Sequence, residues 1–266
     1  MKELKTLYPV LESAKQHTHI DNATYNAMYK KSIEQPDVFW AEQAEQFLDW
    51  YKPWDKVSNV NLKTADIKWF SGGKLNVSYN CIDRHLSTKA NDTAIIFEGD
   101  DPSQDDHITY QQLHDHVCRF ANLLKDRGVK KGDRVCIYMP MIPEVGYAML
   151  ACARIGAVHS VVFGGFSTES IKARIQDADC KVVITADESV RGGKAIALKS
   201  NVDAAIIDCP HVNSVIVIKR TGGTIHWNKA IDLDYNEVVS KYAPVCKPEI
   251  MDAEDPLFIL YTSGST

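Results

Sequence analysis

The sequence AVHSVVFGGFSTESIKARIQDADCKVVIT, residues 157–185, contains two apolar runs separated by a stretch with helical spacing. Residues 157–163 and 181–185 are rich in β-branched residues and are typical of buried strands. Between them, Ser167 provides a helix cap for residues 167–178. The short connections predict a strand, a returning helix and a second strand parallel to the first.

The same alternation continues on both sides of this stretch. Thr109 and Gln112 have capping-box spacing at the start of a helix that Gly128 ends, and Gly156 ends the next helix. We therefore predict an α/β fold with a mostly parallel sheet flanked by helices, as part of a larger domain. Strands are expected at 93–99, 133–139, 214–219 and 257–261, a hairpin partner at 107–110, and helices at 109–128, 144–156 and 194–207.

The first eighty residues have a different pattern. Residues 38–54, VFWAEQAEQFLDWYKPW, carry aromatic and apolar residues at helical spacing as far as Tyr51, and Pro53 ends the pattern. Residues 67–86 have little periodicity and are expected to be irregular, leading into a short helix. We expect this aromatic-rich segment to wrap over the larger body.

Composition excludes several classes of protein. A net charge of -5 gives no electrostatic reason to expect nucleic acid or an anionic membrane as partner, and no apolar run approaches the ~20 residues of a membrane helix. The seven cysteines are scattered without a C-x-x-C pair, so buried reduced thiols are expected rather than zinc or disulfides. The N-terminal residues lack a secretory pattern, and a cytoplasmic location is expected.

Ligands of open α/β sheets bind beyond the carboxyl ends of the strands, and the first such loop is FGGFS, residues 163–167. Gly164 and Gly165 permit a close approach of backbone, and the following helix terminus favours an anion. A tight turn without a ligand is the alternative.

The second loop is VRGGK, residues 190–194. Arg191 and Lys194 lie on either side of Gly192 and Gly193, and this pair of cations suits a phosphate. A solvated basic turn is the alternative. The loop is not a Walker A motif, because Glu188 stands where that motif requires glycine.

The third loop is TSGST, residues 262–266, directly after the apolar run 257–261, which is expected to be a strand buried on both faces. Its hydroxyl groups are those of Thr262, Ser263, Ser265 and Thr266. Backbone amides around Gly264 can form an anion-binding nest. A surface turn is the alternative.

Three long stretches carry a family resemblance: WFSGGKLNVSYNCIDRHL (69–86), VVFGGFSTESIKARIQDADCKVVITADESVRGGK (161–194) and DPLFILYTSGST (255–266). Together they resemble the AMP-forming acetyl-CoA synthetases of the acyl-adenylate-forming enzyme superfamily, from about Ala41 to Thr266. The resemblance implies residues 1–83 as an N-terminal extension of that type and 84–266 as the first part of the AMP-binding domain. Members of the family are longer, so we expect the N-terminal portion of such an enzyme, without activity of its own.

The resemblance implies a two-step ligase reaction. Acetate attacks the α-phosphate of ATP with help from Mg²⁺, giving acetyl-adenylate and pyrophosphate, and the CoA thiol then displaces AMP. Thr262, Ser263, Gly264, Ser265 and Thr266 match the phosphate loop. The positions implied for CoA are Phe163, Gly164, Gly165, Arg191, Gly192, Gly193 and Lys194. No complete catalytic set and no protein ligand set for a metal is expected in these residues.

Other functions stay open. Propionyl-CoA synthetases share these motifs, and the acyl pocket that separates the two lies beyond the matched stretches. A non-catalytic CoA-binding or interaction module is a second alternative. A Rossmann dehydrogenase is excluded by the lack of G-x-G-x-x-G between a strand and a helix. The expected partners are small molecules, namely acetate, ATP and CoA, with no indication of oligomeric state.

Overall fold

The computed structural model describes residues 9–262, which form two compact units. The first unit contains the residues up to Leu48 together with Asp55–Ser71, and the second contains Asp49–Trp54 and the residues from Gly72 onward. Within the described residues, every helix is too short or too polar to span a membrane.

The first unit combines three helices with a β-hairpin and has an aromatic cluster. The Trp40 ring contacts Phe39 at 5.1 Å and Trp69 at 6.5 Å between centroids. The helix predicted in residues 38–54 ends at Phe47 and not at Tyr51. Tyr51 itself belongs to the second unit, where its amide pairs with the carbonyl of Lys74 (2.8 Å). Residues 67–71, expected to be irregular, belong to a strand. The elements are α1 Glu12–Gln16, α2 Asn22–Glu34, α3 Pro36–Phe47, β1 Lys56–Asn61 and β2 Asp66–Ser71.

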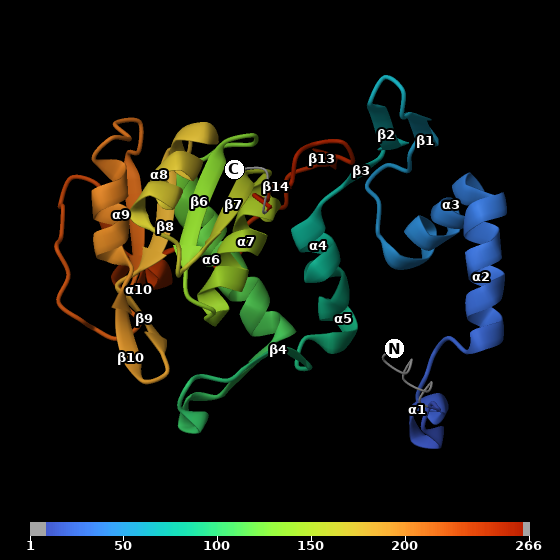
Figure 1. The fold of residues 1–266 in the computed structure, drawn as a ribbon, viewed down its shortest axis with the longest axis horizontal. Coiled ribbons are helices and arrows are strands. Elements are labelled where there is room, and N and C mark those ends of the chain that lie inside the picture. The colour runs from blue at the N-terminus through green and yellow to red at the C-terminus, as the bar shows by residue number, and fades with distance from the viewer. Residues whose placement is uncertain (1–8, 263–266) are drawn as a thin grey trace, which may run out of the picture. The chain divides into compact units, whose positions relative to one another are not determined.

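A six-stranded parallel sheet forms the centre of the second unit, in the order β12-β11-β8-β6-β7-β14 (Figure 1). Val135 of the central strand pairs with His159 on one side and Val182 on the other. The prediction of an α/β fold with a mostly parallel sheet is confirmed. The strands are β6 Arg134–Met139, β7 Val158–Phe163, β8 Val182–Ala186, β11 Ser214–Ile218, β12 Asp232–Asp234 and β14 Phe258–Ile259.

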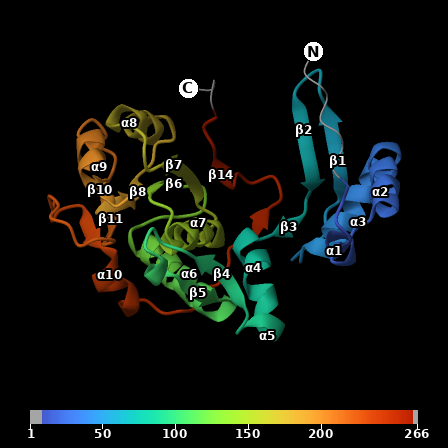
Figure 2. The same ribbon diagram turned by 60° about the horizontal axis from the view of Figure 1, so that its bottom comes forward.

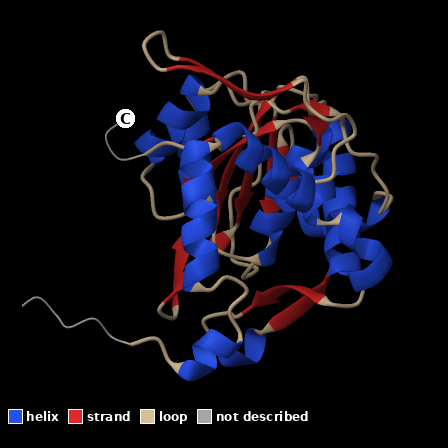
Figure 3. Ribbon diagram, turned by 90° about the vertical axis from the view of Figure 1, so that its right-hand side faces the viewer, coloured by secondary structure: helices blue, strands red, loops and turns tan. Residues whose placement is uncertain are grey.

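Helices cover both faces of this sheet. Figure 2 shows α8 and α9 on one face and α6 and α7 on the other, and Figure 3 shows the helices and strands in separate colours. Right-handed crossovers require this arrangement, because the chain runs from β6 to β7 in one direction and then from β7 back across β6 to β8 in the other. The helices are α6 Tyr110–Asp126, α7 Pro143–Ile155, α8 Thr168–Asp177 and α9 Lys199–Ile206.

Local signals set the helix ends. Thr109 Oγ1 accepts from the Gln112 amide (3.2 Å) while the Gln112 side chain accepts from the Thr109 amide (2.8 Å), which is the predicted capping box. Gly128 and Gly156 have φ of 82° and 72°, in the left-handed region that ends helices. The predicted hairpin before α6 is also present, with β4 Thr93–Phe97 antiparallel to β5 Asp106–Thr109.

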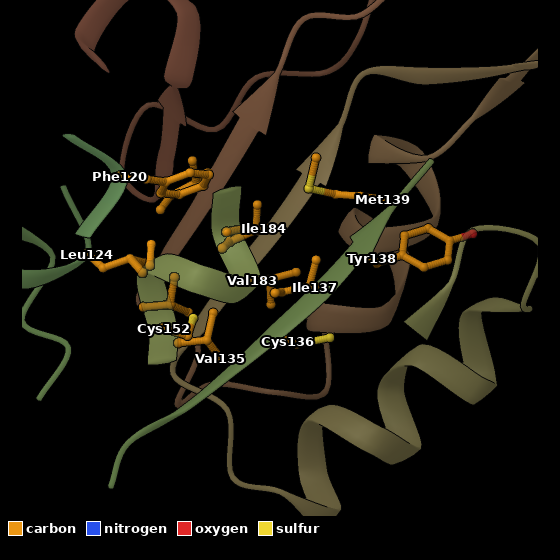
Figure 4. Packing of buried hydrophobic residues seen from close by; sticks show 14 of the residues in the cluster. Phe120, Leu124, Val135, Cys136, Ile137, Tyr138, Met139, Cys152, Val183 and Ile184 are labelled. Carbon is orange, nitrogen blue, oxygen red and sulfur yellow. The ribbon is translucent and has the colours of Figure 1, made fainter. Parts of the chain in front are cut away.

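The core consists of alternate residues of the central strands packed against both helix layers. In Figure 4, Val135 and Ile137 lie on the side of Phe120 and Cys152, whereas Tyr138 points to the opposite face. All of these side chains are at most 1% exposed. Six of the seven cysteines are buried, as predicted, and Cys81 is exposed.

Two expected elements differ from the structure. Residues 194–197 were expected to begin a helix, but they form β10 Lys194–Ala197, antiparallel to β9 Glu188–Arg191, and α9 begins at Lys199. Residues 257–261 were expected to be buried on both faces, but Phe258 is 52% and Leu260 65% exposed. The reason is that β14 pairs only with β7 in the described part of the chain and forms an edge of the sheet.

Short elements complete the second unit. A buried ion pair joins them to α7: Arg154 donates two hydrogen bonds of 2.8 Å to Asp83. The remaining elements are β3 Lys74–Leu75, α4 Val77–Cys81, η1 Asp83–His85, α5 Leu86–Lys89, η2 Pro102–Gln104, α10 Tyr235–Val238, η3 Val239–Lys241 and β13 Met251–Asp252.

Candidate functional site

The candidate site is the carboxyl edge of the parallel sheet, where the chain direction switches. After β6 the chain runs to β7 on one side, and it then crosses to β8 on the other side of β6. Ligands of open α/β sheets bind at such a switch point. The FGGFS loop follows β7 directly, and the VRGGK loop is the tip of the β9–β10 hairpin that follows β8, so both extend from this edge.

The glycine turn after β7 is held close to the sheet. Tyr138 donates its hydroxyl hydrogen to the carbonyl oxygens of Gly164 and Phe166, both at 3.1 Å. A Cβ added to Gly164 would lie 3.1 Å from the carbonyl oxygen of Met139, and one added to Gly165 would lie 2.7 Å from the Phe163 ring. Neither glycine has a positive φ, so glycine is required at these two positions by the close approach of neighbouring atoms and not by the backbone conformation.

Two aromatic rings give this turn an exposed apolar surface. Phe163 is 58% exposed and Phe166 is 42% exposed, and their rings meet edge to face at 5.9 Å. The next helix, α8, begins at a cap in which Ser167 accepts from the amide of Ser170 (3.4 Å). Exposed rings beside a helix N-terminus can contact an apolar group and an anion at the same time.

Arg191 and Lys194 occupy the tip of the β9–β10 hairpin. The two residues pair directly across the strands, and Gly192 and Gly193 form a two-residue turn with φ of 56° and 73°. Both cations are exposed, and among residues 9–262 neither has an ion-pair partner. Like charges placed directly opposite each other repel, and a bound anion would remove that repulsion.

The fully buried carboxylate of Asp187 fixes the base of this hairpin. Its oxygens accept from the backbone amides of Glu188 (2.7 Å), Arg220 (2.8 Å) and Gly222 (2.8 Å). A carboxylate held by backbone N–H groups needs no cation. Asp187 thereby joins the end of β8, the hairpin and the loop after β11. Asp187 was not among the predicted site residues, although its place directly after a buried strand is a signal in the sequence.

The structure brings the hairpin base, but not its tip, to the glycine turn. A Cβ at Gly164 would lie 3.8 Å from Leu198, and Asn201 donates to the hydroxyl of Tyr138 (3.3 Å). Lys194 lies three strand residues before the end of β10, or about 10 Å along an extended chain. The candidate site is therefore elongated, with apolar rings near the sheet and cations further out.

The third expected loop falls mostly outside the described residues. Of Thr262, Ser263, Gly264, Ser265 and Thr266, the structure describes only Thr262, which is exposed. The residue before it, Tyr261, donates its hydroxyl hydrogen to Asp177 of α8 at 2.5 Å. Burial and this hydrogen bond raise the pKa of Tyr261, so the hydroxyl stays protonated.

Two cavities lie away from this edge. One of about 600 Å³ lies between α9 and residues 226–231, and one of about 320 Å³ lies beside the amino ends of β6 and β7. Neither cavity is lined by the residues expected to bind CoA or phosphate. Within residues 9–262, no group of three or more His, Cys, Asp or Glu side chains could hold a metal ion.

Comparison with known proteins agrees with this geometry. The family model described as "AMP-binding enzyme" matches residues 82–266, which include the whole parallel sheet. The chain belongs to the AMP-binding enzyme family. A second family model, "Acetyl-coenzyme A synthetase N-terminus", matches residues 25–81. The resemblance seen in the sequence is thus confirmed at the level of the family.

The most similar curated relatives include acetyl-coenzyme A synthetases. The one from Saccharophagus degradans is 64% identical over 98% of this chain and 40% of its own length, and that from Alkalilimnicola ehrlichii is 59% identical over the same shares. The solved acetoacetyl-CoA synthetase from Streptomyces lividans superposes with a TM-score of 0.81 at 28% identity, covering 95% of this chain and 38% of that one. The chain spans about 40% of the length of these AMP-binding relatives.

Proposed function

We propose that this chain supplies CoA-binding and phosphate-binding parts of an AMP-forming acetate–CoA ligase. The observation that carries the proposal is the 64% identity with an acetyl-coenzyme A synthetase across 98% of the chain. In the reaction, a carboxylate oxygen of acetate attacks the α-phosphorus of ATP, and pyrophosphate leaves. The sulfur of CoA then attacks the acyl carbon, and AMP leaves.

Arg191 and Lys194 would bind the nucleotide phosphates of CoA. Guanidinium grips two phosphate oxygens, and the ammonium adds a point charge. Both cations are exposed and lack an ion-pair partner within the described residues, which supports this role. Lys194 lies about 10 Å along β10 from the hairpin base that contacts the glycine turn, and this separation suits an elongated ligand whose phosphates and thiol lie at opposite ends. Phe163, Gly164 and Gly165 would then contact the less polar part of CoA.

Thr262, Ser263, Gly264, Ser265 and Thr266 would bind the phosphates of ATP. Backbone amides and hydroxyl groups that surround a glycine stabilise the charge that develops on the phosphate oxygens. These residues would transfer no proton. Assistance by Mg²⁺ is part of the proposal, although no group of three or more His, Cys, Asp or Glu side chains in the described residues could hold the ion.

We also propose a division of the chain and a location. Residues 1–83 would be the acetyl-CoA-synthetase-type extension and 84–266 the first part of the AMP-binding domain. Free cysteines in the described residues support a reducing, cytoplasmic compartment.

The test measures acetate-dependent ATP–pyrophosphate exchange and acetyl-CoA formation with the complete product of the gene. Exchange with acetate at a higher kcat/KM than with propionate is expected. A preference for propionate would assign the neighbouring substrate class instead. The absence of exchange with either acid would refute the ligase. A calorimetric titration of residues 1–266 with CoA would then distinguish a CoA-binding module from a protein that binds no CoA.

The cation pair is tested by the same titration. Replacing both Arg191 and Lys194 by alanine should weaken CoA binding. A matched control replaces Lys63 and Lys68, two exposed lysines of the first unit, and should leave the affinity unchanged. Equal effects of the two double variants would show that only net charge matters.

A further inference from the structure

Arg174 of α8 lies between two aromatic rings that belong to separate parts of the candidate site. Its guanidinium carbon is 4.9 Å from the centroid of the Phe166 ring and 5.0 Å from that of Tyr261. The residue is 9% exposed, and its Nη1 donates to the carbonyl of Ser170 (3.0 Å). Among the described residues no carboxylate forms an ion pair with it.

This arrangement makes the two rings the main stabilisation of the charge. A buried cation without a counter-ion is costly unless other groups compensate for the lost water. The faces of aromatic rings attract cations, and a planar guanidinium can stack on two faces at once. If one ring moves away, the guanidinium loses half of this compensation, so the positions of Phe166 and Tyr261 depend on each other through Arg174.

The two rings mark two different binding functions. Phe166 closes the glycine turn, where the hydroxyl of Tyr138 also fixes its carbonyl at 3.1 Å. Tyr261 directly precedes Thr262, the first residue of the expected phosphate loop, and its hydroxyl is bonded to Asp177, one helical turn after Arg174. Two side chains of α8, Arg174 and Asp177, thus contact Phe166 of the glycine turn or Tyr261, the residue before the expected phosphate loop.

We propose that Arg174 is a positioning residue that fixes the CoA-binding turn and the phosphate loop relative to each other by stacking between Phe166 and Tyr261. The inference rests on the proposed function and deepens it. It predicts that a single side chain outside both binding loops affects the use of both nucleotides.

The test uses steady-state kinetics of the complete gene product with Arg174→Ala. The KM for CoA and the KM for ATP should each rise by about five- to tenfold, as expected for the loss of one stacked cation per loop. The KM for acetate should stay within about twofold of the unsubstituted protein. Arg174→Lys keeps a cation between the rings and should recover most of both losses. Damage to folding alone would lower the amount of active enzyme and leave the KM values unchanged.

Two further comparisons keep the inference falsifiable if Arg174→Ala does not fold. Phe166→Leu should raise mainly the KM for CoA and Tyr261→Leu mainly the KM for ATP. Lys172→Ala is the matched control: it removes a cation of the same helix whose partner is the exposed Asp208 (3.0 Å) and should change neither value.

Unchanged KM values in a folded Arg174→Ala, or a loss in Arg174→Lys as large as in the alanine variant, would overturn the inference. Failure of the proposed function is distinct, because the unsubstituted protein would then show no acetate-dependent exchange.

Discussion

Replacing Asp187 should destabilise the carboxyl edge of the sheet more than any exposed carboxylate does. Its side chain is fully buried and accepts three backbone hydrogen bonds of 2.7–2.8 Å, two on Oδ1 and one on Oδ2. Hydrogen bonds to a charged group contribute about 1.5–3 kcal/mol each, and a buried amide left without a partner costs about 1–3 kcal/mol. Because the alanine cavity admits some water, we take the lower figure for each bond and expect a loss of about 4–5 kcal/mol in Asp187→Ala.

Asp187→Asn distinguishes the hydrogen bonds from packing. The amide keeps the shape of the side chain and one acceptor oxygen, but its NH₂ group faces the amide of Gly222, so donor meets donor. We expect a loss of about 2–3 kcal/mol, because the two bonds on Oδ1 remain.

Urea denaturation gives the free energy of unfolding, and hydrogen exchange read by mass spectrometry locates the effect. Peptides covering residues 186–191 and 219–223 should exchange faster in both variants, whereas peptides of α6 should not at low denaturant. Asp208→Asn is the control, because that carboxylate is 61% exposed and forms an exposed ion pair with Lys172, and its loss should cost at most about 1 kcal/mol. An Asp187→Ala protein within 1 kcal/mol of the unsubstituted protein, with unchanged exchange in both peptides, would refute the reasoning.

Three further predictions concern pH, salt and the glycine turn. Burial lowers the pKa of His159 to about 4, so between pH 6.5 and pH 4 the unfolded chain binds a proton that the folded chain excludes. The free energy of unfolding therefore decreases as the pH is lowered through this range. The free energy of unfolding from urea titrations should be about 2 kcal/mol lower at pH 5 than at pH 7, and His159→Phe should remove this part of the slope. If Arg191 and Lys194 bind phosphate, the affinity for CoA measured by calorimetry should fall about tenfold for each cation removed. The difference in affinity between the variants and the unsubstituted protein should become smaller in high salt, and a difference that does not depend on salt would contradict binding through charge. Gly164→Ala would place a methyl group 3.1 Å from the carbonyl oxygen of Met139, and a shift of the turn should raise the KM for CoA while costing about 1–2 kcal/mol in thermal denaturation; an unchanged KM would separate the turn from CoA binding.

Local signals in the sequence were sufficient where a structure depends on neighbouring residues. The capping box of Thr109 and the left-handed glycine at 156 set helix ends within one turn of chain, and both were predicted correctly. The incorrect helix prediction for residues 194–197 also concerned a local signal. The pair Gly192 and Gly193 strongly favours a two-residue hairpin turn, which makes the residues after it a strand in spite of their helical spacing.

Exposure of the third apolar run could not be read from composition. Residues 257–261 have the composition of a strand buried on both faces, yet Phe258 and Leu260 are exposed because β14 lies at the sheet edge. Strand order depends on pairings between segments far apart in the chain, and the periodicity of a single strand carries no information about its neighbours.

The sequence by itself determined the alternation of strands and helices in the parallel sheet, the start of α6, the glycines that end α6 and α7, and the positions of the FGGFS and VRGGK loops. These features arise from interactions within a few residues. Only the tertiary structure decided that Asp187 holds the amide of Gly222 and that Arg174 lies between Phe166 and Tyr261. Asp187 and Gly222, and Arg174 and Tyr261, are tens of residues apart in the sequence. They meet only because parallel strands bring their carboxyl ends to one edge of the sheet and α8 packs across it.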